Sequence, residues 1–197
     1  MADFGGRRPQ TLTIDRVAHQ SRFFLNNYVH EMFRDDGIGN DTPAMEILQE
    51  PEDPRDLPPE HVIEIKRSIR SIIDAQDEDT KLNHLIPKVP QGREEEVTMN
   101  VARGLFDDGI FNWGRVLGLF QLAYKVCKKV VNLVGLFRSL INAIIDFMSE
   151  NVIDWIFQQG GWDGLLDFVR RSGILNALIF GGVAIGVAAI VIYNNSR

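Results

Sequence analysis

The sequence contains one cysteine, Cys127, so a disulfide within the chain is excluded and a reducing compartment is favoured. No apolar stretch follows the arginines near the N-terminus, so we do not expect a secretory signal. There is no clustered basic face of the kind that binds nucleic acid. Few residues suit a metal or a catalytic centre, because the four histidines lie at unrelated spacings: His19, His30, His61 and His84. We therefore expect no cofactor, no metal, no nucleic-acid partner and no enzymatic activity.

An excess of acid is confined to one segment, residues 35–60. The chain has a formal net charge of −6, whereas this segment alone carries nine acids and one base. It also holds five of the eight prolines. Such a composition buries too little apolar surface to offset chain entropy, so we predict a disordered loop, either a plain solvated linker or a regulatory insertion. Residues 1–34 before it are predicted to form an N-terminal region and a first helix.

No run of alternating residues demands a strand, and the apolar spacing elsewhere is helical. The residues from 112 to 134 are apolar almost all round the helix, which is typical of a helix at the centre of a bundle or in a membrane. Residues 136–157 follow as an amphipathic partner. We therefore predict an all-α fold in which residues 61–171 and the first helix form one core around a central hydrophobic hairpin. The apolar surface of the central helix is interrupted on one side only, by Lys125, Lys128 and Lys129.

A second apolar segment, residues 174–193, has 20 residues without a charge. A helix of this length spans about 30 Å, the thickness of the hydrocarbon core of a bilayer. We predict a C-terminal tail anchor from Ile174 to Tyr193, with a long buried core helix as the alternative. Gly182 and Gly186 form a small-residue pattern that could bring two such spans together.

Two short motifs resemble those of a known family. Residues 108–116 contain Asn112, Trp113, Gly114 and Arg115, and residues 155–166 contain Trp155, Gly160, Gly161, Trp162 and Asp163. In this order, and followed by an anchor, they resemble the first and second homology motifs of the Bcl-2 family. They also suit helix capping by asparagine, bidentate bonding by arginine, and close packing by glycine and tryptophan. For Asn112, Gly114, Gly160, Gly161 and Trp162, helix capping and packing are the alternative explanation to a role in binding.

The helix predicted over residues 60–75 carries an isoleucine stripe at i, i+4 and i+7. The resemblance implies that this helix is the third homology motif, in which Asp74 pairs with the groove residue Arg115. Ile73 stands where the family has a small residue, and Gln76 stands at the fourth anchor position. The alternative is a plain amphipathic core helix with a solvated Asp74. The three groove anchors implied by the resemblance are Ile65, Ile69 and Ile72.

The second motif and the residues around the first are similar to those of the Bax-like, pore-forming branch of the family. This resemblance implies a Bcl-2-like helical bundle and a pro-apoptotic effector that oligomerises and permeabilises the outer mitochondrial membrane after a helix activates its groove. A guardian that sequesters death-promoting helices in the same groove is the alternative, and a membrane-anchored adaptor without pore activity is a third. The three lysines of the central helix would face lipid headgroups, or only solubilise an exposed edge.

The resemblance also implies the partners and the location of the protein. The expected partners are Bcl-2 family proteins, death-promoting amphipathic helices, a membrane and, once activated, further copies of this chain. The expected location is the outer mitochondrial membrane through the tail anchor, with the endoplasmic reticulum as the alternative. At rest the protein is either cytosolic, with its tail in the groove, or inserted.

Overall fold

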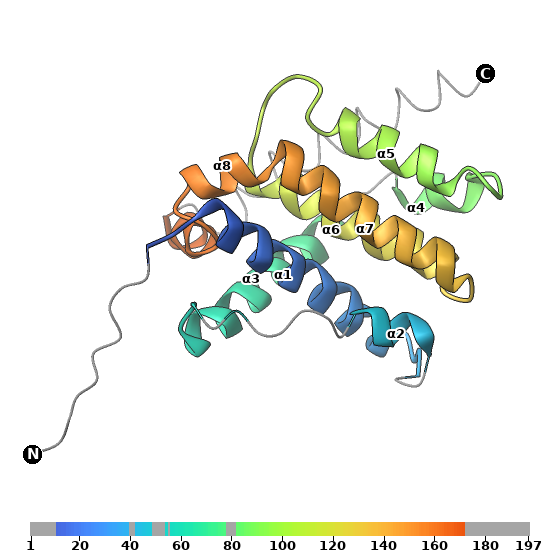
Figure 1. Ribbon diagram of the computed structural model, residues 1–197, viewed down its shortest axis with the longest axis horizontal. Helices are drawn as coiled ribbons and strands as arrows, with labels where there is room; N and C mark the ends of the chain where they lie inside the picture. Colours follow the sequence, from blue (N-terminus) through green and yellow to red (C-terminus); the bar gives the residue numbers. More distant parts are fainter. Residues whose placement is uncertain (1–10, 40–41, 49–53, 55, 78–81, 172–197) are drawn as a thin grey trace, which may run out of the picture.

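The computed structural model describes residues 11–39, 42–48, 54, 56–77 and 82–171. Within these ranges the chain forms helices and no strand, which confirms the all-α prediction (Figure 1). The last described residues, 163–171, are also helical. The helices before them are α1 (Ile14–Asp35), α2 (Pro43–Leu48), α3 (Pro59–Asp77), α4 (Leu82–Leu85), the 3₁₀ turn η1 (Ile86–Lys88), α5 (Glu94–Gly104), α6 (Trp113–Lys129), α7 (Val134–Asn151) and α8 (Ile153–Gln158).

Several of these helices begin at residues that satisfy the free N–H groups of a first turn. The hydroxyl of Thr13 accepts a hydrogen bond from the backbone N–H of Arg16 at the start of α1. The amide oxygen of Asn112 does the same for the N–H of Arg115 at the start of α6, at 2.9 Å. Proline is the first residue of α3, where its missing N–H costs nothing.

Helix α6 lies at the centre of the bundle and contacts α1, α3, α5 and α7. Fourteen of its 17 residues are buried, which confirms the prediction of a central helix that is apolar almost all round. Figure 1 shows α6 running behind α7, with α1 alongside them. The bundle is therefore organised around one helix that has almost no contact with water.

The isoleucine stripe of α3 faces this core. Ile65, Ile69 and Ile72 are each at most 2% exposed, and α3 packs on α6 and α1. Ile73, next to the stripe, is also only 2% exposed. Two adjacent residues of α3 are thus buried at this point, so the core-facing surface of α3 is wider than a single stripe.

The segment predicted as one helix over residues 136–157 is divided in two. Helix α7 ends at Asn151, and α8 begins at Ile153 after a non-helical Val152. The side chain of Asn151 donates to the carbonyl of Phe147, so it competes with the backbone at the end of α7. The break turns Ile153 and Ile156 into the core, where both are at most 1% exposed.

The prediction of a disordered loop over residues 35–60 is wrong for residues 43–48. These residues form α2, whose Ala44, Met45 and Leu48 are buried and which packs on α1 and α7. Three apolar residues at helical spacing bury enough surface here, although the segment around them is acidic and rich in proline. Composition averaged over the whole segment concealed this local amphipathic pattern.

Among the described residues no helix is both long enough and apolar enough to cross a membrane. The predicted tail anchor, with Ile174, Gly182, Gly186 and Tyr193, lies outside the residues that the structure describes. The anchor therefore stays a prediction from the sequence.

Candidate functional site

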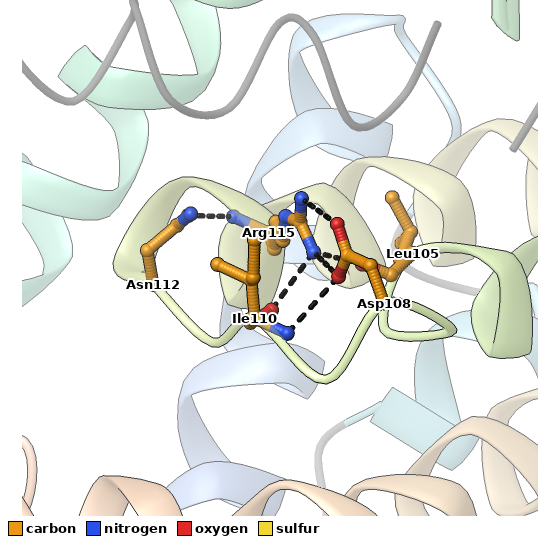
Figure 2. A network of polar contacts seen from close by, with 5 residues as sticks. All are labelled: Leu105, Asp108, Ile110, Asn112 and Arg115. Atoms are coloured by element: carbon orange, nitrogen blue, oxygen red, sulfur yellow. Dashed lines mark hydrogen bonds and ion pairs between the residues drawn. The ribbon is translucent and has the colours of Figure 1, made fainter. Parts of the chain in front are cut away.

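Arg115 fastens the turn between α5 and α6. Its guanidinium is buried, with 8% of the residue exposed, and donates to the carbonyls of Leu105 (3.1 Å) and Ile110 (2.9 Å). It also forms a two-pronged ion pair with Asp108, in which Nη2 donates to Oδ2 at 2.8 Å and Nη1 to Oδ1. Figure 2 shows this network, with Asn112 capping α6 beside it. We call this set the α5–α6 clasp.

The clasp changes the acid–base chemistry of Asp108. Hydrogen bonds from Arg115 and from the backbone of Ile110 lower the pKa of the Asp108 carboxyl to about 2. Arg115 still has an unused donor, because its buried Nε has no hydrogen-bond partner among the described residues. A buried, charged N–H group is costly to leave without a hydrogen bond. This N–H is therefore the donor through which Arg115 could bind a new partner.

The resemblance implied a pair between Arg115 and Asp74, and the structure does not form it within the chain. Asp74 is exposed and pairs with Arg70 on its own helix, at 2.9 Å. Arg70 also reaches Asp35 at the end of α1, at 2.8 Å. Asp74 therefore forms its ion pair at the surface, whereas the guanidinium of Arg115 is bonded within the α5–α6 clasp.

The tryptophans of the first and second motifs pack together. The ring centroid of Trp113 lies 5.1 Å from that of Trp155 and 5.5 Å from that of Trp162. Trp162 is fully buried, and its Nε1–H donates to the hydroxyl of Ser21 on α1, at 2.9 Å. The second motif is thereby joined both to the first motif and to α1.

Two glycines of the second motif have backbone conformations that other residues rarely adopt. Gly160 and Gly161 have φ values of 91° and 74°, and they turn the chain between α8 and the last described helix. At Gly164 there is no room for a Cβ, which would collide with the backbone carbonyl of Gln159. Gly114, the glycine of the first motif, is buried in α6. Backbone conformation thus accounts for Gly160 and Gly161, and the lack of space for a Cβ accounts for Gly164.

A hollow of about 350 Å³ opens where the two motifs meet. Its wall combines apolar rings with a few polar groups, the usual character of a binding site for a ligand or a side chain. Asp167 and Arg171 are among its polar groups, and both follow the second motif on the last described helix. The remaining lining residues are Asn112, Trp113, Trp155, Gln159, Gly164 and Phe168.

Helix α3 is also held at its N-terminal end. Nδ1 of His61 donates to Oδ1 of Asp163, at 2.9 Å, and both side chains are partly exposed. Glu64 pairs with Arg170 nearby, at 3.1 Å. These contacts join the predicted third motif to the residues that follow Trp162, so all three motifs meet in one region of the bundle.

The three lysines of α6 contact other segments of the folded chain. Lys125 donates to the side chain of Asn83 at 2.6 Å, and Lys128 pairs with Asp36 at 2.9 Å. Lys129 donates to the carbonyls of Ile86 and Val89. For Lys125 and Lys128, which bond to other side chains, the predicted contact with lipid headgroups therefore requires that these bonds break, whereas Lys129 is exposed in the closed bundle.

Comparison with known proteins identifies the class to which this bundle belongs. A model of the Bcl-2 family, described as apoptosis regulator proteins, matches residues 68–162, which include the first motif and most of the second. The chain is 31% identical to the apoptosis regulator Bax of Rattus norvegicus over 159 residues, which are 78% of this chain and 77% of that protein. The chain belongs to the Bcl-2 family, as its motifs predicted, and apoptosis regulators of this family are non-enzymatic.

Further comparisons are consistent with this assignment. The chain is 29% identical to Bax of Homo sapiens over 174 residues, covering 84% of this chain and 85% of that one. The crystal structure of chicken BOK has a TM-score of 0.60 to this fold at 18% identity, over 79% of this chain and 98% of that one. The bundle is therefore a Bcl-2-like fold.

Sequence reasoning missed several residues of this region. Asp108 lies seven positions before Arg115 and gave no signal of its own, because its role depends on the turn between them. The bond between His61 and Asp163 joins residues 102 positions apart, which no local pattern reports. Phe168 could have been noticed as an apolar residue directly after the second motif.

Proposed function

We propose that this protein is a pro-apoptotic effector that permeabilises the outer mitochondrial membrane after a helix binds its groove. The observation that carries the proposal is the α6–α7 hairpin. Most of its apolar residues are buried in the closed bundle, and no acid lies between Asp108 and Asp146. Once released, such a hairpin has apolar faces for the acyl chains, and every charge from the start of α6 as far as Arg138 of α7 is positive, which suits the headgroups.

The activating step would act on α3. Its stripe is buried against α6, so the helix must leave the bundle before it can enter the groove of a second copy. Asp74 is already at the surface and would pair with Arg115 of that copy, whose Nε is the unused donor. Exchange of this kind would produce dimers, and the tail anchor would hold them at the membrane.

The alternative function is a guardian, and the packing of α3 favours it at one point. Ile73 is buried beside Ile72, where the family has a small residue. A wider buried surface holds α3 more firmly in its own bundle, which suits a protein that binds other helices but keeps its own. The groove would then capture death-promoting helices without dimer formation.

Release of a dye from liposomes of mitochondrial lipid composition separates these functions. The full-length protein is tested with and without a death-promoting helical peptide, and binding of the peptide is measured in parallel. For an effector we expect release that depends on protein concentration and increases with peptide. Tight binding without release would establish the guardian, and neither binding nor release would leave the membrane-anchored adaptor.

The variant Asp74→Ala tests exchange of α3 without disturbing the core, because Asp74 is exposed and, among the described residues, pairs with Arg70 at the surface. We expect it to reduce dye release at least several-fold while the unfolding transition stays unchanged. The matched control is Glu64→Ala, an exposed acid on the same helix that is also paired with an arginine. Equal release from both variants would contradict the proposed pairing of Asp74 with Arg115.

A further inference from the structure

The turn between α6 and α7 lies at one end of the bundle (Figure 1), and some of its apolar side chains are exposed. Leu133 is 49% exposed and Val134 is 37% exposed, next to each other in the sequence. Val131 and Leu136 on either side are partly buried. The turn itself is well defined, with the N–H of Leu133 donating to the carbonyl of Val130 at 2.8 Å. We call this segment, residues 131–136, the hairpin tip.

Positive charge surrounds the hairpin tip. Arg138 is exposed on the first turns of α7, and Lys88 is exposed in η1. Among the described residues, the ammonium of Lys129 donates to backbone carbonyls of the η1 region, those of Ile86 and Val89, and pairs with no carboxylate. These two bonds also place η1, which includes Lys88, beside the end of α6.

Two acids of the neighbouring elements are engaged in the fold, whereas Glu46 of α2, which packs on α7, is exposed. Asp36 is already paired with Lys128 and accepts a hydrogen bond from Tyr124, at 2.7 Å. Glu95 accepts from the hydroxyl of Ser139. An apolar tip flanked by exposed lysine and arginine is complementary to a bilayer with anionic headgroups, where leucine and valine enter the interface and lysine and arginine stay in the headgroups.

We propose that the hairpin tip is a docking site for an anionic lipid surface and that it works in the closed bundle, before activation. Leu133 and Val134 enter the interface, and Lys88, Lys129 and Arg138 contact the headgroups. No helix has to leave the bundle, because these side chains are exposed in the folded protein. The docking is therefore independent of pore formation and of release of α3.

The test places an environment-sensitive fluorophore at position 134 through Val134→Cys in the full-length protein. The native Cys127 is fully buried, and burial raises the pKa of its thiol, so it stays unlabelled in the folded chain. Wild-type protein treated with the same reagent measures any labelling of Cys127. The matched control is Ile14→Cys, because Ile14 is 48% exposed and begins α1 at the opposite end of the bundle (Figure 1).

Each labelled protein is mixed, without activating peptide, with vesicles of phosphatidylcholine alone or of phosphatidylcholine with phosphatidylserine. We expect a blue shift and quenching by lipid-borne quenchers at position 134 on the anionic vesicles only, with no dye release. Lys88→Gln combined with Arg138→Gln should weaken the affinity for anionic vesicles about thirtyfold, since each basic residue near an anionic surface contributes about fivefold to the binding constant. Arg103→Gln, on the exposed part of α5, controls for a general loss of charge.

Four results would overturn the proposal. Equal shifts at positions 134 and 14 would indicate general adsorption or unfolding on the vesicles. Equal shifts on neutral and anionic vesicles would remove the role of charge. A shift without vesicles that grows with protein concentration would assign the tip to a second copy of the chain. A shift that requires the peptide and accompanies dye release would mean that the tip meets lipid only after the bundle opens, so docking would fail while the proposed function stands.

Discussion

Replacing Trp162 by phenylalanine tests how the second motif is joined to the rest of the bundle. The change removes two things at once: one ring of the indole and the Nε1–H that donates to Ser21. Trp162 is fully buried and Ser21 is 3% exposed, so water cannot replace either contact. Ser21 keeps its own bond to the carbonyl of Val17, at 2.7 Å, and loses only the incoming hydrogen bond.

The expected loss in the free energy of unfolding follows from these contacts. Truncation of a buried tryptophan to alanine costs about 3–5 kcal/mol, and phenylalanine retains part of the ring, so this part costs about 1–2 kcal/mol. The buried hydrogen bond contributes about 1 kcal/mol. We therefore expect Trp162→Phe to reduce the free energy of unfolding by about 2–3 kcal/mol.

Urea unfolding followed by far-UV circular dichroism measures this change without relying on tryptophan fluorescence. A double-mutant cycle with Ser21→Ala isolates the hydrogen bond, and its coupling energy should be about 1 kcal/mol. A coupling energy near zero would show that Trp162 and Ser21 are not bonded in solution. A total loss below about 0.5 kcal/mol would refute the burial of Trp162 as well.

Three further predictions concern other parts of the site. The folded-state pKa of Asp108, about 2, lies below its ordinary value of 3.8. Its pairing with Arg115 therefore stabilises the fold fully above pH 3.8, and this stabilisation is lost as the pH falls through 2. Urea unfolding at a series of acidic pH values should show the loss, and the variant Asp108→Asn should lack this part of the pH dependence. Gly164→Ala should cost about 1–3 kcal/mol in urea unfolding because its Cβ collides with backbone, whereas Gly135→Ala, in open space on α7, should leave the midpoint unchanged or raise it. Ile73→Ala should cost about 2–4 kcal/mol in the same assay, and a neutral result would contradict its burial in the core.

The sequence alone predicted those features that depend on local periodicity. The stripe of Ile65, Ile69 and Ile72 is buried as its spacing indicated, and Asn112 caps α6 as its position before an apolar run indicated. Both predictions need only the geometry of one helix, which repeats every 3.6 residues. The same reasoning identified α6 as the central helix of the bundle.

Other features depend on contacts between distant segments. Within the folded chain Asp108 is the acid that pairs with Arg115 across the α5–α6 turn, and the pairing of Asp74 with Arg115 of a second copy stays a prediction. Helix α2 was concealed because Met45 and its two buried neighbours lie among acids and prolines. The break at Val152 depends on where the core lies relative to α7, which a period of 3.6 residues cannot report.

The α5–α6 clasp determines which parts of the molecule can move as a unit. Arg115 binds the end of α5, the turn and Asp108 at once, so α5 and α6 cannot separate without exposing a buried guanidinium. The joint between α6 and α7 has no such fastening, and its residues 131–135 are at least partly exposed. Any hinge that divides the bundle during a conformational change should therefore lie at residues 130–133. Helices α5 and α6 would move together as one rigid body on one side of this hinge, and α7 would lie on the other side.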